Sequence, residues 1–431
     1  MSRLLTSFLA GAALTLGCPA LAQTIAITGG KVVIGDGSAP IDNGTVIVTN
    51  GRVVAAGRGV AVPAGAQTID ASGKWVTPGI VAGFSRLGLA AVDAVDAAND
   101  TTASNSPFSA SLDIASAVNP DVQSIAVSRA AGVTRAIVAP QIGSSIFAGL
   151  GAVIDTGSDP DPVTKARVFQ FVEFGETGAR RAGGSRPALY ASFRNALSEA
   201  RDLAAGTRKD DAQLKRPDAA ALVPLLNGSM RLIIHVEGAH DILAVLALKA
   251  EYPQLNLVLA GVTEGWRVAR QLAASKVPVI ASALNNLPSS FEQLASTQSN
   301  VGRMRAAGVQ VAIGMIDDDD TRQAQYSMQY AGNLVALARV PGATGLTWDQ
   351  AFAAISSVPA EVIGMGGEIG SLRAGRRGDV VIWSGDPLEV TTAAERVWID
   401  GVEQPLTSHQ TGLRSRYKSL APDDLPQAYK R

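Results

Sequence analysis

Short apolar runs alternate with longer helix-like stretches along the middle of the chain. Two of the helix-like stretches are residues 241–251 and 267–276. Strands that alternate with helices are typical of βα units and a parallel sheet. Eight such runs favour an α/β fold with a closed (β/α)8 barrel of the TIM type over an open sheet. The runs predicted to be buried strands are residues 80–82, 133–138, 152–154, 168–172, 232–236, 257–259, 277–280 and 309–313.

Both ends of the chain have a different pattern, in which short β-like runs are broken by turns. Asn50-Gly51 separates two of these runs and predicts a hairpin, because both central residues of a tight two-residue turn need positive φ. We expect the two ends to pair in one small β-rich domain of residues 23–75 and 366–405, beside a barrel of residues 76–365. The expected strands are residues 24–27, 31–34, 45–48, 52–57, 378–383, 386–388 and 396–401, followed by an irregular tail over residues 406–431.

Residues 90–119 are rich in Ala, Ser and Asp and lack periodicity, which predicts a long loop over the barrel mouth. Loops at that end of a barrel shape its specificity, so the sequence does not reveal the substrate. It does not determine the oligomeric state either.

The N-terminal residues 1–22 have the pattern of a signal peptide, with Arg3, an apolar run over residues 4–16 and the cleavage site Ala20-Leu21-Ala22. This pattern predicts export to a periplasm. Cys18 follows Gly17 and leaves a lipoprotein as the alternative, although Thr15 stands where a larger aliphatic residue is usual. Cleavage after Ala22 removes the one cysteine, so no disulfide is expected. No other stretch is long and apolar enough for a membrane span.

The charge balance argues against nucleic acid as a partner. The chain has 37 Lys and Arg against 38 Asp and Glu, a net charge of -1, and no basic stripe. A hydrophobic content of 47% is ample for a large core. The expected partner is therefore a small molecule.

Two motifs carry a family resemblance. Residues 74–81 (Lys-Trp-Val-Thr-Pro-Gly-Ile-Val) and residues 370–381 resemble the amidohydrolase superfamily at the start of its first barrel strand and at its return to the small β domain. The order of segments over residues 24–404 is most similar to the secreted, imidazolonepropionase-like branch. The resemblance implies hydrolysis of a non-peptide C–N bond, of the cyclic-amide type, by a water bound to one or two divalent ions.

The resemblance also implies metal ligands, most of which this chain lacks. Phe84 and Arg86 stand at the first strand's His-x-His positions, and Gly261 stands for the sixth-strand histidine. Phe84 cannot bind metal, and Arg86 is a permanent cation. His235 matches the fifth-strand ligand and Asp317 the eighth-strand acid, and Glu173 is a substitute on the fourth strand. With only three histidines in the chain, the usual four cannot be assembled.

A remodelled site is one alternative. His235, His240 and Asp317 could bind one divalent ion, zinc by the chemistry of the donors, with Glu237 and Asp317 in catalytic roles. His240-Asp241, however, is equally typical of a helix start on the surface, and His409 is expected to be an exposed tail residue. The expected cofactor is therefore either none or a single ion.

Asp317 begins a run of four aspartates, 317–320, which suits a solvated loop. An ion pair between Arg86 and Asp317 in place of the metal is a further hypothesis.

Two functions remain open from the sequence. The chain is either an atypical hydrolase with a degenerate metal site or a non-catalytic binding protein on the same scaffold. In the second case it self-associates or pairs with a related active subunit.

Overall fold

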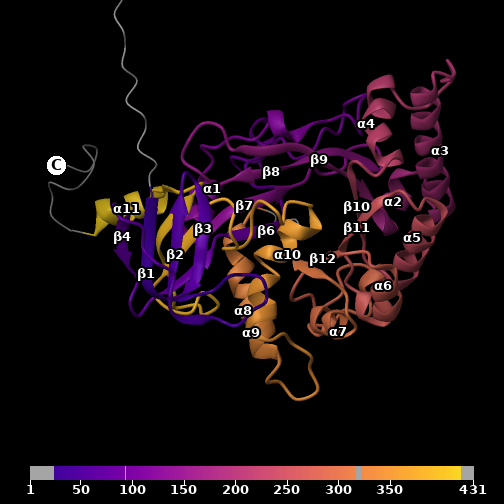
Figure 1. The fold of residues 1–431 in the computed structure, drawn as a ribbon. Helices are drawn as coiled ribbons and strands as arrows, with labels where there is room; N and C mark the ends of the chain where they lie inside the picture. The colour runs from indigo at the N-terminus through magenta and orange to yellow at the C-terminus, as the bar shows by residue number, and fades with distance from the viewer. Residues whose placement is uncertain (1–23, 93, 317–321, 419–431) are drawn as a thin grey trace, which may run out of the picture.

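The computed structural model describes residues 24–92, 94–316 and 322–418, which form two eight-stranded sheets with flanking helices (Figure 1). The predicted signal peptide (residues 1–22), Cys18 and Asp317 lie outside the described residues. Within them, no helix is long and apolar enough to cross a membrane.

The first sheet combines strands from both ends of the chain, in the order β16-β15-β14-β5-β1-β2-β3, with β4 paired to β1. The N- and C-terminal segments meet where β5 and β14 pair antiparallel, so the two ends share one sheet as predicted. The strands are β1 (Thr24–Val32), β2 (Ile41–Thr49), β3 (Arg52–Arg58), β4 (Gln67–Asp70), β5 (Trp75–Pro78), β14 (Val380–Trp383), β15 (Ala394–Ile399) and β16 (Val402–Glu403).

The predicted hairpin is confirmed between β2 and β3, where Thr49 pairs with Arg52. Asn50 has φ 51° and Gly51 has φ 73°, as this turn requires. The two runs predicted within residues 24–34 form one continuous strand, β1, because the chain passes through the intervening glycines with register shifts instead of turning.

Each of the eight runs predicted to be buried strands overlaps one strand of the second sheet, although residues 277–278 and 309–310 lie outside the strands. Their order around the sheet, β13-β12-β11-β10-β9-β8-β7-β6, follows the order in the chain. The strands are β6 (Ile80–Ser85), β7 (Val133–Val138), β8 (Phe147–Asp155), β9 (Val163–Glu173), β10 (Arg231–Val236), β11 (Asn256–Gly261), β12 (Val279–Ala281) and β13 (Val311–Ile313).

The sheet departs from the predicted (β/α)8 barrel at β8, which pairs antiparallel with both β7 and β9. The connection from β8 to β9, residues 156–162, is too short for a crossover helix and forces a hairpin. The repeating βα unit is therefore broken here, while the other strands run parallel.

The sheet is nearly closed. β13 and β6 form no ladder, but the backbone of Ala354 and Ile355 lies between them and accepts the N–H groups of Ile313 and Val81, each at 2.9 Å. Further along, the Met315 N–H donates to the Phe84 carbonyl at 2.9 Å. The segment after the last strand thus completes the barrel-like wall.

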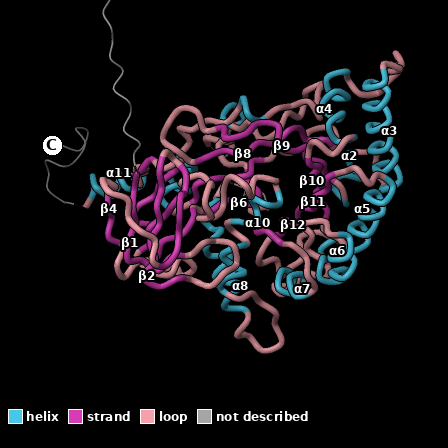
Figure 2. The backbone as a smooth tube through the Cα atoms, viewed as in Figure 1, coloured by secondary structure: helices cyan, strands magenta, loops and turns pink. Residues whose placement is uncertain are grey.

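Helices connect and cover the parallel strands, and α3, α5 and α6 lie along the outer side of β10 and β11 (Figure 2). The predicted helices at 241–251 and 267–276 correspond to α5 and to η3 with α6. The helices are α1 (Gln123–Ala130), α2 (Gly175–Arg181), α3 (Arg186–Ala205), α4 (Arg216–Leu226), α5 (Ala239–Glu251), α6 (Ala269–Ser275), α7 (Asn300–Ala306), α8 (Ser327–Leu337), α9 (Trp348–Ala353), α10 (Ser357–Val362) and α11 (His409–Tyr417), with short 3-10 turns η1 (Asp96–Ala98), η2 (Ile114–Ser116), η3 (Gly265–Val268), η4 (Phe291–Gln293) and η5 (Ala324–Tyr326).

Two sequence predictions near the C-terminus were wrong. Residues 386–388 form a turn in which Asp386 accepts the Leu388 N–H at 2.9 Å, so no strand forms there. The predicted irregular tail contains α11, which starts with a capping box of Ser408 and Thr411.

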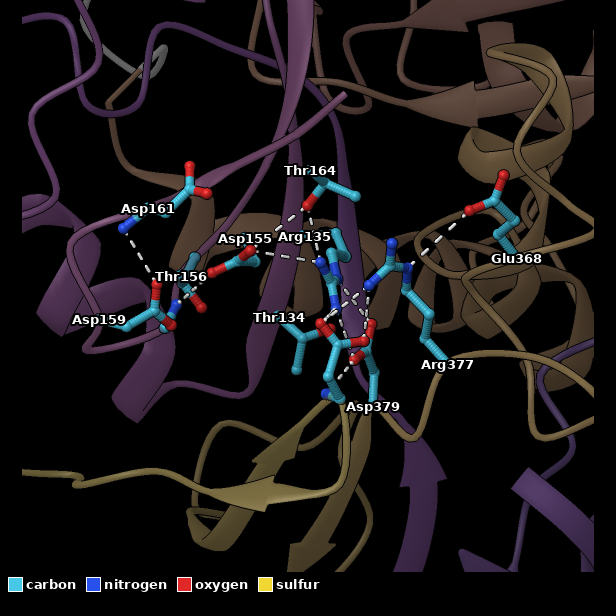
Figure 3. Close-up of polar contacts among 12 residues, drawn as sticks. Thr134, Arg135, Asp155, Thr156, Asp159, Asp161, Thr164, Glu368, Arg377 and Asp379 are labelled. Atoms are coloured by element: carbon cyan, nitrogen blue, oxygen red, sulfur yellow. Dashed lines mark hydrogen bonds and ion pairs between the residues drawn. The ribbon is translucent and has the colours of Figure 1, made fainter. Parts of the chain in front are cut away.

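Arg135 on β7 connects the two sheets (Figure 3). Its side chain is fully buried, and Nε and Nη2 donate to the two carboxylate oxygens of Asp379 at 2.8 and 2.9 Å. Nη2 also lies 2.9 Å from Asp400, and Nη1 donates to Thr164 at 2.7 Å and to Asp155 at 3.3 Å. The guanidinium therefore joins β7, β8 and β9 to the C-terminal strands.

The charges around Arg135 are nearly balanced. Burial raises the pKa of Asp155 to about 6, which brings its protonation close to neutral pH. Asp400 shares a second cation, Arg377, whose Nη1 lies 3.0 Å from both of its oxygens. One buried arginine can thus bind three carboxylates.

We predict that Arg135→Met lowers the free energy of unfolding by about 3–5 kcal/mol, because it leaves the carboxylates buried without their cation. Arg194→Met is the control, since Arg194 and Glu251 form an exposed pair worth less than about 1 kcal/mol. Urea unfolding of both variants measures the difference. Equal losses would show that the buried pair does not hold the sheets together.

Candidate functional site

Three charged side chains meet at the carboxyl ends of β9 and β10. In the parallel register of these strands, His235 pairs with Glu173, the last residue of β9, so the two side chains are adjacent. Glu237 follows β10 directly and, two residues from His235, lies on the same face. The sequence singled out all three residues, although Glu173 only as a substitute ligand.

The imidazole of His235 lies between the two carboxylates. Nδ1 is 2.6 Å from Glu173 Oε1, and Nε2 is 2.8 Å from Glu237 Oε1. Burial opposes a charge on this ring, but the two carboxylates outweigh it and raise the pKa of His235 well above 6.5. Both ring nitrogens therefore face carboxylate oxygens, an arrangement that favours the protonated imidazolium over the neutral ring.

Glu237 is held from its other side as well. It is buried, and its Oε2 accepts the Thr263 N–H at 2.8 Å. Burial favours the neutral acid, but the bonds from His235 and Thr263 keep the pKa of Glu237 below its ordinary value.

Gly261, at the end of β11, has no side chain and so leaves the space that the side chains of His235 and Glu237 occupy. A Cβ on Gly261 would lie 2.7 Å from Glu237 Cδ and 2.8 Å from His235 Cδ2, closer than side-chain carbons can approach. Its φ of 86° is also in the left-handed region. The glycine at position 261 is therefore part of the packing of the His235–Glu237 pair.

The arrangement does not fit the metal cage that the resemblance implies. A metal needs a free imidazole lone pair, whereas both nitrogens of His235 are at hydrogen-bond distance from carboxylates. Phe84 instead packs inside the barrel, with its ring 5.4 Å from that of Phe171. Within residues 24–92, 94–316 and 322–418, no group of three His, Cys, Asp or Glu side chains could hold a metal ion.

The structure does not bring the other predicted ligands to this cluster. His240 is exposed on α5 and does not line the cavity, because it points to solvent from the first turn of the helix. His409 is exposed on α11, as expected. The role of Asp317 and its pairing with Arg86 fall outside the described residues.

The cluster lines a cavity of about 290 Å³. Arg86, which is 7% exposed, brings a guanidinium to its wall beside Phe84. Glu292 approaches from the other side, on η4, and its Oε2 accepts the Glu176 N–H at 2.9 Å. The cavity thus gathers three carboxylates and two cationic groups.

Glu292 has the acid–base property that catalysis uses near neutral pH. Burial raises its pKa to about 7, and the carboxylates of Glu237 and Glu176 act in the same direction against the opposing charge of His235. The sequence analysis missed Glu292, because it lies in an irregular segment with no motif around it. The only available signal was the presence of an acid in the segment between strands β12 and β13.

Comparisons with known proteins agree on one family. The model of the amidohydrolase family matches residues 231–403. Amidohydrolase tasK of Hapsidospora irregularis is 25% identical over 85% of the chain, and the imidazolonepropionase of Maricaulis maris (strain MCS10) is 31% identical over 32% of it. The matches cover only 40% and 31% of the lengths of these two relatives.

Solved structures share the fold at low sequence identity. An amidohydrolase from Thermotoga maritima MSB8 has a TM-score of 0.78 and 22% identity, over 88% of this chain and 99% of that one. Molinate hydrolase has a TM-score of 0.55 and 17% identity, over 89% and 95% of the two chains.

We predict that Gly261→Ala lowers the free energy of unfolding by about 2–4 kcal/mol, through backbone strain and the collision with the His235–Glu237 pair. Gly308→Ala is a matched control, since Gly308 has φ 93° and open space where its Cβ would lie. Only the strain, about 1 kcal/mol, is expected there. Chemical unfolding measures both, and equal losses would contradict the steric role of Gly261.

We also predict a pH effect on stability through Glu292. The pKa of Glu292 in the folded protein is raised above the ordinary 4.5. Its protonated form therefore stabilises the fold fully below about pH 4.5, and this stabilisation is lost as the pH rises through about 7. Between about pH 5 and pH 8, the free energy of unfolding should fall by about 1–2 kcal/mol more in the wild type than in Glu292→Gln. Parallel pH profiles for the two proteins would exclude the shift.

Proposed function

The chain belongs to the amidohydrolase superfamily, and we propose that it hydrolyses the non-peptide C–N bond of a small cyclic amide without that superfamily's metal cage. Membership and the hydrolases among its structural neighbours support a hydrolase by resemblance. The bond type and the degenerate metal site are our proposal.

One observation carries the proposal: an imidazolium fixed between two carboxylates lies with Glu292 and Arg86 in one cavity, at the barrel end where this fold places its active sites. Acids, bases and cations that converge in a cleft are the groups that hydrolysis of a polar bond needs. A cavity of about 290 Å³ has room for a small ring.

Glu292 is the proposed general base. As a carboxylate it takes a proton from water while the water oxygen forms its bond to the carbonyl carbon. When the C–N bond breaks, the carboxyl group returns that proton to the leaving nitrogen. A pKa near the working pH suits both steps.

Arg86 supplies positive charge where the carbonyl oxygen becomes negative, whereas the charge of His235 is already balanced by Glu173 and Glu237. Preorganised charge in a site sheltered from water is an effective source of transition-state stabilisation. Glu173 and Glu237 are positioning residues, since they hold the imidazolium and keep it protonated. Asp317, the other acid that the sequence suggested for catalysis, stays a prediction.

A second function is favoured by the replaced ligand positions. Phe84, Arg86 and Gly261 are each packed in ways that suit the present cavity, so a protein that binds ligand without turnover is consistent with the same geometry. Such a protein would pair with an active relative or with itself. In either case we propose a periplasmic location, on the signal-peptide pattern of residues 1–22.

We predict slow hydrolysis of some members of a panel of hydantoins, lactams and dihydropyrimidinones, unaffected by 1,10-phenanthroline. The value of kcat should rise with pH through about 7 and fall by about 100-fold or more in Glu292→Gln. Glu389→Gln, at an exposed acid, is the control and should retain full activity. Mass spectrometry of the purified protein measures its metal content.

The outcomes separate the two functions. Stoichiometric zinc, together with activity that the chelator removes, would overturn a metal-independent site. Ligand binding by calorimetry without turnover of any compound would establish the non-catalytic function.

A further inference from the structure

A second cavity, of about 480 Å³, lies beside the one that contains His235. Its wall is built from the loop after β6, the connection between β7 and β8, the start of β8 at Ala148 and the start of α4 at Pro217. These segments follow the carboxyl ends of β6 and β7, so the second cavity opens at the same end of the barrel.

Much of this wall comes from residues 100–117, within the loop predicted from the sequence, and this segment is firmly attached. Asp218 on α4 is 2% exposed, and one of its oxygens accepts the N–H groups of Ser109 and Ser111 and the Ser111 hydroxyl, at 3.0, 2.9 and 2.6 Å. A buried carboxylate with three donors is a strong anchor. The loop therefore forms a preformed wall.

A second set of contacts attaches the loop to the β7–β8 connection. The Gln141 N–H donates to the Thr101 carbonyl at 2.7 Å, and the Thr102 hydroxyl donates to the Ile142 carbonyl at 3.0 Å. The Leu150 N–H on β8 donates to the Leu112 carbonyl at 2.7 Å. The cavity is thus bounded on both sides by backbone that is already hydrogen-bonded.

The two cavities adjoin. Gln141 lines both of them, and its neighbour Ile142 lines the cavity of His235. A ligand that places its polar end against His235 and Glu292 can therefore extend past Gln141 into the larger space.

The chemistry of the larger cavity suits an apolar group. Phe108, Leu112, Ile114 and Ala148 contribute to its wall, and the Phe108 ring is 41% exposed, which is apolar area that a ligand would cover. The wall has two acids, Asp100 and Asp113, and Asp113 is already engaged by Arg167 at 2.6 Å. The wall includes no Lys, Arg or His side chain to bind an anion.

We propose that this loop cavity is a specificity site that binds an uncharged apolar arm, of the size of one or two rings, on the molecule whose polar group binds at His235. The identity of that molecule as a substrate rests on the proposed function. The binding of the apolar arm does not, because it requires no turnover.

The neutral dye N-phenyl-1-naphthylamine is a direct probe. Its fluorescence should rise on titration with the protein and saturate at one site. Ala103→Trp and Ala117→Trp each place a large side chain in the cavity and should weaken dye binding by at least about tenfold, in line with the apolar area they displace. Ala103→Leu is a milder change that preserves the test if a tryptophan prevents folding.

Two controls accompany these variants. Ala336→Trp adds the same side chain at an exposed position of α8, and Glu292→Gln alters only the neighbouring cavity. Both should bind the dye within twofold of the wild type. Binding that does not saturate, or an affinity unchanged in all three cavity variants, would overturn the specificity site. Loss of hydrolysis in Glu292→Gln with unchanged dye binding would separate the two proposals.

Discussion

The assembly of the two sheets depends on one buried cation. Arg135 lies on the second barrel strand, yet its principal partner, Asp379, comes from near the other end of the chain. A guanidinium taken out of water is tolerable only when carboxylates surround it with good geometry. Burial of Arg135 with its partners therefore requires the C-terminal strands to be in place, and this couples the small sheet to the wall that carries the site. It also explains the Asp of the Gly378-Asp379 motif, which is structural and not part of the site.

The hydrophobic patterns predicted the positions of the strands along the chain better than their directions in the sheet. All eight barrel runs and the β2–β3 hairpin were found, because burial and turn geometry depend on local residue types. The direction of β8 is not encoded in its apolar residues. It follows from its connections, and residues 156–162, with Gly157, Pro160 and Pro162, had the composition and length of a hairpin loop. The short length of this connection was the signal for an antiparallel β8, and the alternation of strands and helices did not reveal it.

The site was only partly predictable. His235 and Glu237 could be placed together because alternate residues near a strand end share a face, and Glu173 follows from the adjacent strand. His240 differs because the chain has already turned into α5, and in the first turn of that helix its side chain faces solvent. Glu292 could not be found, since its approach to the cavity depends on the path of an irregular segment. No periodicity encodes such a path.

Gly261, Glu237 and His235 form a mutually dependent set. Because Gly261 has no side chain, Glu237 can reach His235, and Glu237 Oε1 then lies at hydrogen-bond distance, 2.8 Å, from Nε2 of the ring. A histidine at position 261 alone would collide with that pair, and a histidine at position 84 would place a polar ring against Phe171 in the barrel core. Arg86 meanwhile contributes to the cavity wall a positive charge that needs no ion to supply it. A histidine at either position would therefore be unfavourable without further changes around it, so the packing at Gly261 and at Phe84 constrains which side chains this end of the barrel can hold.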